Sequence, residues 1–263
     1  MVEPKRSYLV CATPRSGSTL LCEALTQTGV AGRPQEYFEV LRHSGLPREP
    51  REYFTGVADP GVLSLLPATQ PARPEAEGFA ARLAAVAELG TTPNGVFGAK
   101  LMWGHLDDLA ARAHEVPGYA EPAGADLLAA LFGGPAYVLV TRHDKVAQAV
   151  SLWRAVQTRA WRAGSGEGRT AVYHFGAIDH LVSQLSDQDE RWRRWFAAAD
   201  IEPVVVTYEA LAERHEETVA RVLRRLGILA PALPGAPLER QGDARSDAWA
   251  RRYRRERAAG VPA

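Results

Sequence analysis

A short polar run near the start of the chain carries the residue types that hold phosphate. Residues 15–19 read Arg-Ser-Gly-Ser-Thr, between the apolar residues 8–12 and a run whose apolar positions recur at helical spacing over residues 20–25. The first apolar run is typical of a buried strand and the second of a helix. A turn from a strand into a helix points free backbone N–H groups and the positive end of the helix dipole at one place, which suits an anion.

The members of this run each suit such an anion site. Gly17 lets the backbone approach the ligand closely, and Arg15 supplies positive charge. Ser18 and Thr19 add hydroxyls, and Ser16 adds a backbone N–H within the turn. The pattern Gly-x-x-x-x-Gly-Lys-Ser/Thr of common nucleotide loops is absent, and with it the lysine and the magnesium-holding hydroxyl. The alternative is an ordinary helix N-cap, where serine and threonine are favoured in any case.

A second candidate anion site follows the most apolar strand of the sequence, expected at residues 136–141. Arg142 comes directly after that strand, and Ser151 lies two turns into the helix that we expect over residues 146–159. An arginine offers a charged fork to phosphate, and a nearby hydroxyl can donate beside it. The pair therefore predicts a second phosphate contact on the neighbouring strand-to-helix turn.

Four apolar runs, each followed by a helical pattern, are the elements that must position these residues. We expect strands at residues 8–12, 95–99, 136–141 and 203–208. Strands that alternate with helices imply an α/β fold with a doubly wound, mostly parallel sheet, helices on both faces and the first strand in the centre. Lys100 follows the second strand, at the edge where ligands of open α/β sheets gather, although an ordinary ion pair is the alternative.

The composition bounds the remaining possibilities. With 263 residues, 46% of them hydrophobic, the chain suits one domain over residues 1–263, with an irregular segment at about 41–75. The formal net charge of zero gives no sign of a nucleic-acid or membrane partner. The two cysteines lie in apolar context, so neither a disulfide scaffold nor a metal site is expected. There is no 18-residue apolar run, and we expect a soluble cytoplasmic protein without membrane insertion.

Longer blocks of the sequence resemble a known enzyme family. Residues 29–38 read Gly-Val-Ala-Gly-Arg-Pro-Gln-Glu-Tyr-Phe, residues 93–103 read Pro-Asn-Gly-Val-Phe-Gly-Ala-Lys-Leu-Met-Trp, and further blocks lie at 150–159 and 238–249. Together with the strand and its Pro-Arg-Ser-Gly-Ser-Thr-Leu turn, they resemble the Stf0-type sulfotransferases. The resemblance implies a P-loop-like sulfotransferase fold. It also implies metal-free transfer of a sulfuryl group from 3′-phosphoadenosine 5′-phosphosulfate (PAPS) to a carbohydrate, most closely the 2-hydroxyl of trehalose, by a homodimer.

The resemblance assigns the general base to the carboxylate of the Pro-Gln-Glu block, which is Glu36 in this sequence. Gln35 stands beside it as a candidate substrate-binding residue, and Lys100 is a candidate at the acceptor or the leaving group. Two aromatic neighbours, Tyr37 and Phe38, are expected to keep water away from the carboxylate. The irregular segment after this block is expected to help form the sugar pocket.

The resemblance also assigns the basic residues to PAPS. Arg15 holds the 5′-phosphosulfate together with the loop amides and hydroxyls, and it stabilises charge that develops on the bridging oxygen, which makes it a candidate catalytic residue. Arg142 and Ser151 correspond to the element that binds the 3′-phosphate. A late basic loop folds over the nucleotide in such enzymes, and Arg240 and Arg245 are the candidates by position.

Three alternatives stay open at this point. A PAPS-dependent enzyme of the same kind could act on another sugar or a glycolipid. A nucleotide-dependent small-molecule kinase would share the parallel sheet and the phosphate-binding loop. Such a kinase would have a Gly-Lys-Ser/Thr loop and metal-binding acids, and the loop of this sequence lacks both. A catalytically silent PAPS- or sugar-binding module would retain the loop without needing a base, and Glu36 disfavours it.

Overall fold

A computed structural model describes residues 4–41, 45–72, 78–161, 170–230, 233, 235 and 244–261. Four parallel strands form the sheet in this part of the chain, in the order β2-β1-β3-β4. Their bounds are Arg6–Ala12 for β1, Val96–Met102 for β2, Ala136–Thr141 for β3 and Val204–Thr207 for β4. The predicted α/β fold with a central first strand is therefore confirmed, because β1 pairs with β2 on one side and with β3 on the other.

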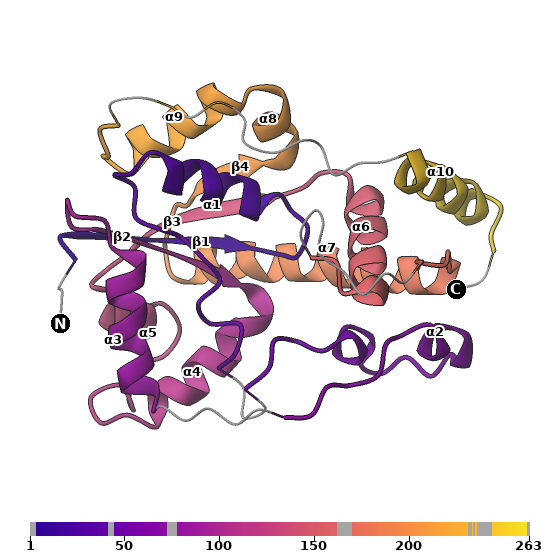
Figure 1. Ribbon diagram of the computed structural model, residues 1–263, viewed down its shortest axis with the longest axis horizontal. Coiled ribbons are helices and arrows are strands. Elements are labelled where there is room, and N and C mark those ends of the chain that lie inside the picture. The colour runs from indigo at the N-terminus through magenta and orange to yellow at the C-terminus, as the bar shows by residue number, and fades with distance from the viewer. Residues whose placement is uncertain are drawn as a thin grey trace.

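Helices cover both faces of the sheet, as Figure 1 shows. One face packs against α1 (Ser18–Gln27), α8 (Tyr208–Glu213) and α9 (His215–Arg225). The other packs against α3 (Phe79–Gly90), α4 (Leu106–His114), α5 (Gly124–Phe132) and α7 (Phe175–Ala198). Alternate residues of β1 enter the two cores, Tyr8 and Val10 on the α1 side and Leu9 and Cys11 on the α7 side. A strand buried on both faces must be apolar throughout, which explains the unbroken apolar run.

A third apolar cluster lies beside the sheet, where α6 (Lys145–Thr158) and α7 pack against α10 (Ala244–Ala258). The segment predicted to be irregular joins this cluster through two short helices, η1 (Pro50–Phe54) and α2 (Pro60–Ser64). Phe54 sits edge-on against Trp153, with ring centroids 5.4 Å apart. The segment is thus anchored through its aromatic side chains, although it has little regular structure.

The strand order places the two predicted anion sites together. After β1 the chain continues to β2 on one side of the sheet, and after β3 it continues to β4 on the other side. The loops that leave β1 and β3 therefore diverge, and this switch point is where ligands bind in open α/β sheets. Residues 13–17 and 142–144 form these two loops.

One predicted boundary was wrong. Lys100 does not follow β2 but lies within it, because the strand is buried over its full length and continues to Met102. After β4, α8 and α9 are separated at Arg214, whose φ of −131° lies outside the helical range. The last helix, α10, begins at Ala244.

Candidate active site

The turn after β1 is bent by two left-handed residues. Arg15 has φ 61° and Gly17 has φ 90°, and the N–H of Ser16 donates to the carbonyl of Thr13 at 3.3 Å. Gly17 is the N-cap of α1, and no side chain caps this helix end. The ordinary N-cap interpretation therefore does not describe the turn, since the first backbone N–H groups of a ten-residue helix have no side-chain partner. Such uncapped N–H groups suit an anionic ligand.

Tyr208 closes the turn from the far side and had no recognisable signal in the sequence. A Cβ added to Gly17 would lie 2.7 Å from Cδ2 of this ring, so the backbone of the turn rests directly against it. The same ring lies under the guanidinium of Arg142, with Cζ 4.3 Å from the ring centroid. Tyr208 thus connects the β1 turn to the arginine that follows β3.

Arg15, Arg142 and Ser151 come together at this turn. Nε of Arg15 donates to Oγ of Ser151 at 2.9 Å, and Nη1 of Arg142 donates to the carbonyl of Arg15 at 3.4 Å. Burial lowers the pKa of the Arg15 guanidinium, and the positive charge of Arg142 lowers it further. Burial also lowers the pKa of Arg142, whose buried Nε has no hydrogen-bond partner among the described residues. The guanidiniums of Arg15 and Arg142 are thus two positive charges held side by side, and Nε of Arg142 is a donor without a partner among the described residues. Both features favour binding of a phosphate-bearing anion.

Glu36 and Lys100 form an ion pair next to the same turn. Nζ of Lys100 lies 2.7 Å from Oε2 of Glu36, and it also donates to Oγ1 of Thr19 at 3.3 Å. Burial acts to lower the pKa of Lys100, but neighbouring groups, Glu36 foremost, together outweigh it and the pKa is raised, so the ammonium stays charged. The pair carries the carboxylate to the first turn of α1, beside the candidate phosphosulfate site.

The aromatic neighbours of Glu36 do not shield it as expected. Phe38 packs into the core, 5.6 Å from Phe132 by ring centroids, and the hydroxyl of Tyr37 donates to the carbonyl of Arg33. Gln35 has an exposed side chain, and its carbonyl accepts the backbone N–H of Lys100 at 2.9 Å. An ion pair, rather than an aromatic enclosure, defines the surroundings of the carboxylate.

His105 is a second residue that the sequence analysis missed. Its Nδ1 lies 3.9 Å from Oε1 of Glu36, and burial lowers its pKa from the ordinary value of 6.5, so the imidazole is neutral near pH 7. It also lines a cleft of about 430 Å³ between η1, α4 and α7. The lining is polar and carries more carboxylates than guanidiniums, and Arg191 is paired with Asp187 at 2.7 Å. Its charged, carboxamide and indole members are Arg48, Glu52, Trp103, Asp107, Asp108, Gln184, Asp187, Gln188 and Arg191. Such a lining suits a neutral, hydroxyl-rich ligand better than an anion.

Of the two candidate arginines in the block at residues 238–249, only one lies among the described residues. Arg240 lies outside the described residues, and Arg245 is exposed in the first turn of α10. That turn is held at α6, because Arg154 donates to the hydroxyl of Ser246. Among the described residues no group of His, Cys, Asp and Glu could hold a metal ion, and Cys11 and Cys22 are buried free thiols. The described part of the chain likewise contains no helix long and apolar enough to cross a membrane.

Known proteins match this chain over nearly its whole length. The family described as Stf0 sulphotransferase matches residues 7–256. The trehalose 2-sulfotransferase of Mycobacterium tuberculosis is 45% identical over 257 residues, covering 95% of each chain. The trehalose 2-sulfotransferase of Mycolicibacterium smegmatis is 42% identical over 262 residues, covering 97% of each chain. A crystal structure of a sulfotransferase from Alicyclobacillus acidocaldarius aligns with a TM-score of 0.47 at 12% identity, covering 98% of this chain and 97% of its own. The family match and the two close relatives show that this chain belongs to the Stf0 sulphotransferase family.

Proposed function

We propose that this protein transfers the sulfuryl group of PAPS to the 2-hydroxyl of trehalose, giving trehalose 2-sulfate and 3′,5′-ADP. The proposal rests on the names of the two relatives at 45% and 42% identity and on the site beside β1. The observation that carries it is the convergence of Arg15, Arg142 and Ser151 on an uncapped helix N-terminus. This arrangement fits a ligand with phosphate groups at two positions.

The chain has donors for both ends of such a nucleotide. The backbone N–H groups of residues 17–19 and the guanidinium of Arg15 would bind the 5′-phosphosulfate, whereas the N–H of Ser16 is already bonded to the carbonyl of Thr13. Arg142, with its unpartnered Nε, and Ser151 would bind the 3′-phosphate, and Arg240 and Arg245 are proposed to fold over the nucleotide. PAPS supplies an activated sulfuryl group with a phosphate leaving group. The positive charge that Arg15 holds at the turn would stabilise the negative charge on the leaving oxygen.

Glu36 is proposed to accept the proton of the acceptor hydroxyl. The hydroxyl oxygen forms the new bond to sulfur, the bond from sulfur to the phosphate oxygen breaks, and the hydroxyl proton passes to the carboxylate. Lys100 hydrogen-bonds this carboxylate at 2.7 Å and thereby fixes its position near Thr19. The polar cleft is the proposed entrance for the sugar, because His105 lines it and lies 3.9 Å from Glu36. Gln35, next to Glu36 in the chain, is a proposed substrate-binding residue.

We further propose that the whole chain acts as one catalytic domain in the cytoplasm and assembles as a homodimer. The homodimer follows from the family resemblance of the sequence blocks. A different sugar or glycolipid acceptor is the competing proposal, because the cleft lining recognises hydroxyl-rich ligands as a class.

A transfer assay with labelled PAPS and a panel of disaccharides tests the proposed reaction. We expect label to enter trehalose, and to enter maltose, sucrose and cellobiose far more slowly. Equal or faster labelling of another sugar would assign the acceptor elsewhere while leaving the PAPS site intact. No labelling of any acceptor, with tight nucleotide binding retained, would favour a silent binding module.

A separate calorimetric titration compares the affinity of the protein for 3′,5′-ADP with its affinity for 5′-AMP. The wild-type protein should prefer 3′,5′-ADP by about tenfold or more, since a hydrogen bond to a charged group contributes about 1.5–3 kcal/mol. Arg142→Ala should lose most of this preference, whereas Arg221→Ala should keep it, because Arg221 donates to the carbonyl of Val205 on the surface. Equal binding of the two nucleotides by the wild type would rule out PAPS.

A further inference from the structure

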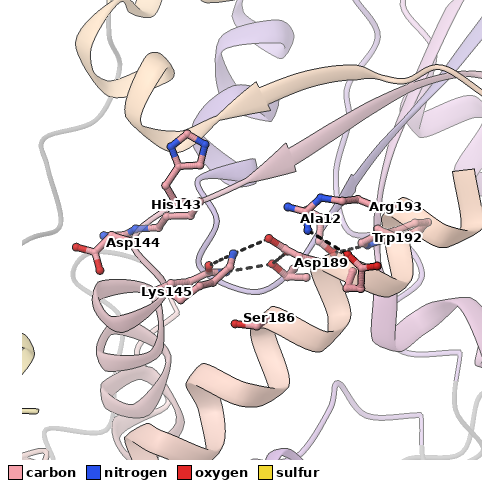
Figure 2. Close-up of polar contacts among 12 residues, drawn as sticks. Ala12, His143, Asp144, Lys145, Ser186, Asp189, Trp192 and Arg193 are labelled. Carbon is pink, nitrogen blue, oxygen red and sulfur yellow. Dashed lines mark hydrogen bonds and ion pairs between the residues drawn. The ribbon is translucent and has the colours of Figure 1, made fainter. Parts of the chain in front are cut away.

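A buried polar network lies beneath the β1 turn and is not part of the site described above. Oδ2 of Asp189 on α7 pairs with Nζ of Lys145 at 2.5 Å, and its Oδ1 accepts from the hydroxyl of Thr13 at 3.0 Å. Nζ of Lys145 also donates to Gln148 at 2.9 Å. Nε2 of Gln148 then donates to Oγ1 of Thr13 at 3.0 Å and to the carbonyl of Pro14 at 2.7 Å. Figure 2 shows Lys145 and Asp189 reaching toward one another from α6 and α7.

The network closes on the backbone where β1 ends. Besides the bonds to Thr13 and Pro14, the indole N–H of Trp192 donates to the carbonyl of Ala12 at 3.1 Å. Three consecutive residues, 12–14, are therefore held from α6 or α7 just before the left-handed Arg15. Because α6 begins directly after the β3 loop, the same network ties the turn after β1 to the loop that carries Arg142.

Burial excludes a direct role in ligand binding for most of this network. Thr13 and Gln148 have exposed fractions of 0% and Asp189 of 2%, so their side chains cannot reach a ligand. A buried ion pair adds little net stability over an apolar pair of the same shape, because desolvation opposes the attraction of the charges. What such a pair does provide is a single allowed arrangement, since any displacement leaves a buried charge or donor unsatisfied. The turn needs this constraint, because it contains two left-handed residues and no capping side chain.

We propose that Lys145, Gln148 and Asp189, called here the loop clamp, are positioning residues that set the direction of the N–H groups of the β1 turn. The inference rests on the proposed binding of PAPS and extends it to residues that do not touch the ligand. The loop clamp acts through the hydroxyl of Thr13 and the carbonyl of Pro14. It therefore sets the affinity for the nucleotide, and none of its residues lines the polar cleft proposed for the sugar.

Thr13→Val tests the loop clamp, because it removes the hydroxyl, keeps the shape and leaves Lys145 and Asp189 in place. We expect about tenfold or greater losses in the affinity for 3′,5′-ADP and in kcat/KM for PAPS, since small misplacements in a preorganised site are costly. The KM for trehalose should be unchanged. Thr13→Ser retains the hydroxyl and should restore wild-type values. Asp189→Asn should reproduce the loss of nucleotide affinity, because the amide has one acceptor oxygen and can accept from Thr13 or from Lys145 but not from both.

Thr91→Val is the matched control for a purely structural effect. Thr91 is buried, its hydroxyl donates to the carbonyl of Ala87 at 2.5 Å, and it bridges to Phe97, which pairs with Ser7 at the opposite end of β1. This variant should lower the melting temperature to a similar degree and leave nucleotide affinity unchanged. If folded Thr13→Val binds 3′,5′-ADP with wild-type affinity, the positioning role proposed for the loop clamp is wrong, while the proposed function stands. A wild-type protein that fails to bind 3′,5′-ADP would overturn the proposed function as well.

Discussion

At the residue scale, the chemistry depends on how Glu36 is held. The sequence predicts an aromatic enclosure for this carboxylate. In the structure the ammonium of Lys100 lies 2.7 Å from it and the neutral imidazole of His105 lies 3.9 Å from it. Lys100 is itself fixed by the hydroxyl of Thr19. The carboxylate is therefore tied to the first turn of α1, and its position is coupled to that of the anion site.

Glu36→Gln should bind both substrates and lose turnover. The amide keeps the size and the hydrogen-bond acceptor but cannot take up the hydroxyl proton, and general-base catalysis contributes about 10²–10⁴-fold. Initial rates with PAPS and trehalose measure the loss. Glu256→Gln is the matched control, because Glu256 is also ion-paired, to Arg252 at 2.7 Å, and is 25% exposed against 24% for Glu36. Near-normal turnover in Glu36→Gln would place the base elsewhere.

The alkaline stability of the same variant reports on Lys100. In the wild type its pKa is raised, so the pair's stabilisation is fully present below pH 10.5 and is lost as the pH rises through the native pKa. In Glu36→Gln the foremost influence that raises the pKa of Lys100 is gone, so this pKa falls, and the contribution of Lys100 to stability shrinks and is lost at lower pH than in the wild type. Chemical unfolding at a series of alkaline pH values measures this effect as the difference between the wild type and Glu36→Gln in how the free energy of unfolding changes with pH.

At the element scale, the β1 turn and the start of α8 work as one unit. Gly17→Ala should lose affinity for 3′,5′-ADP, because the new Cβ would meet the Tyr208 ring at 2.7 Å and displace the support of Arg142. Calorimetric titration with 3′,5′-ADP and 5′-AMP should show the larger loss for the nucleotide that carries the 3′-phosphate. The left-handed φ of 90° adds about 1–2 kcal/mol of strain.

Gly29→Ala separates that strain from the collision. Gly29 ends α1 with φ 71°, and a Cβ there would meet no atom within 4 Å. Both variants should lose stability through backbone strain, but Gly29→Ala should bind the nucleotide as the wild type does. If both variants lose affinity equally, or neither does, Tyr208 does not connect the turn to Arg142.

At the scale of the whole molecule, we predict a homodimer of twice 28.6 kDa by light scattering at working concentration. Tyr53 and Phe54, two aromatic residues of the segment after Glu36, are buried within this chain and are not available for a subunit interface. Val205 is one of several exposed apolar side chains among the described residues. It is 46% exposed on the edge strand β4, and exposed edge strands readily pair, so we propose it for the interface. Val205→Lys should give a monomer. A fully active wild-type monomer would contradict the homodimer.

The sequence by itself determined the elements and the anion-binding character of the β1 turn. Strand β3 has the predicted bounds, Ala136–Thr141, and helix α1, Ser18–Gln27, contains the run of residues 20–25 whose spacing indicated a helix, because both patterns are local. The strand-helix alternation likewise fixed the parallel sheet with β1 inside it. Arg142 and Ser151 could be proposed as a pair because both belong to one strand-to-helix unit.

Only the tertiary structure decided which distant residues meet. Tyr208 under Gly17, His105 beside Glu36 and Asp189 beneath Thr13 join residues far apart along the chain, and no local pattern encodes such contacts. The end of β2 was misjudged for a related reason, since burial by neighbouring elements let the strand continue past Lys100 to Met102. Periodicity shows which face of an element is buried, but packing against other elements selects the partner that each polar group finds.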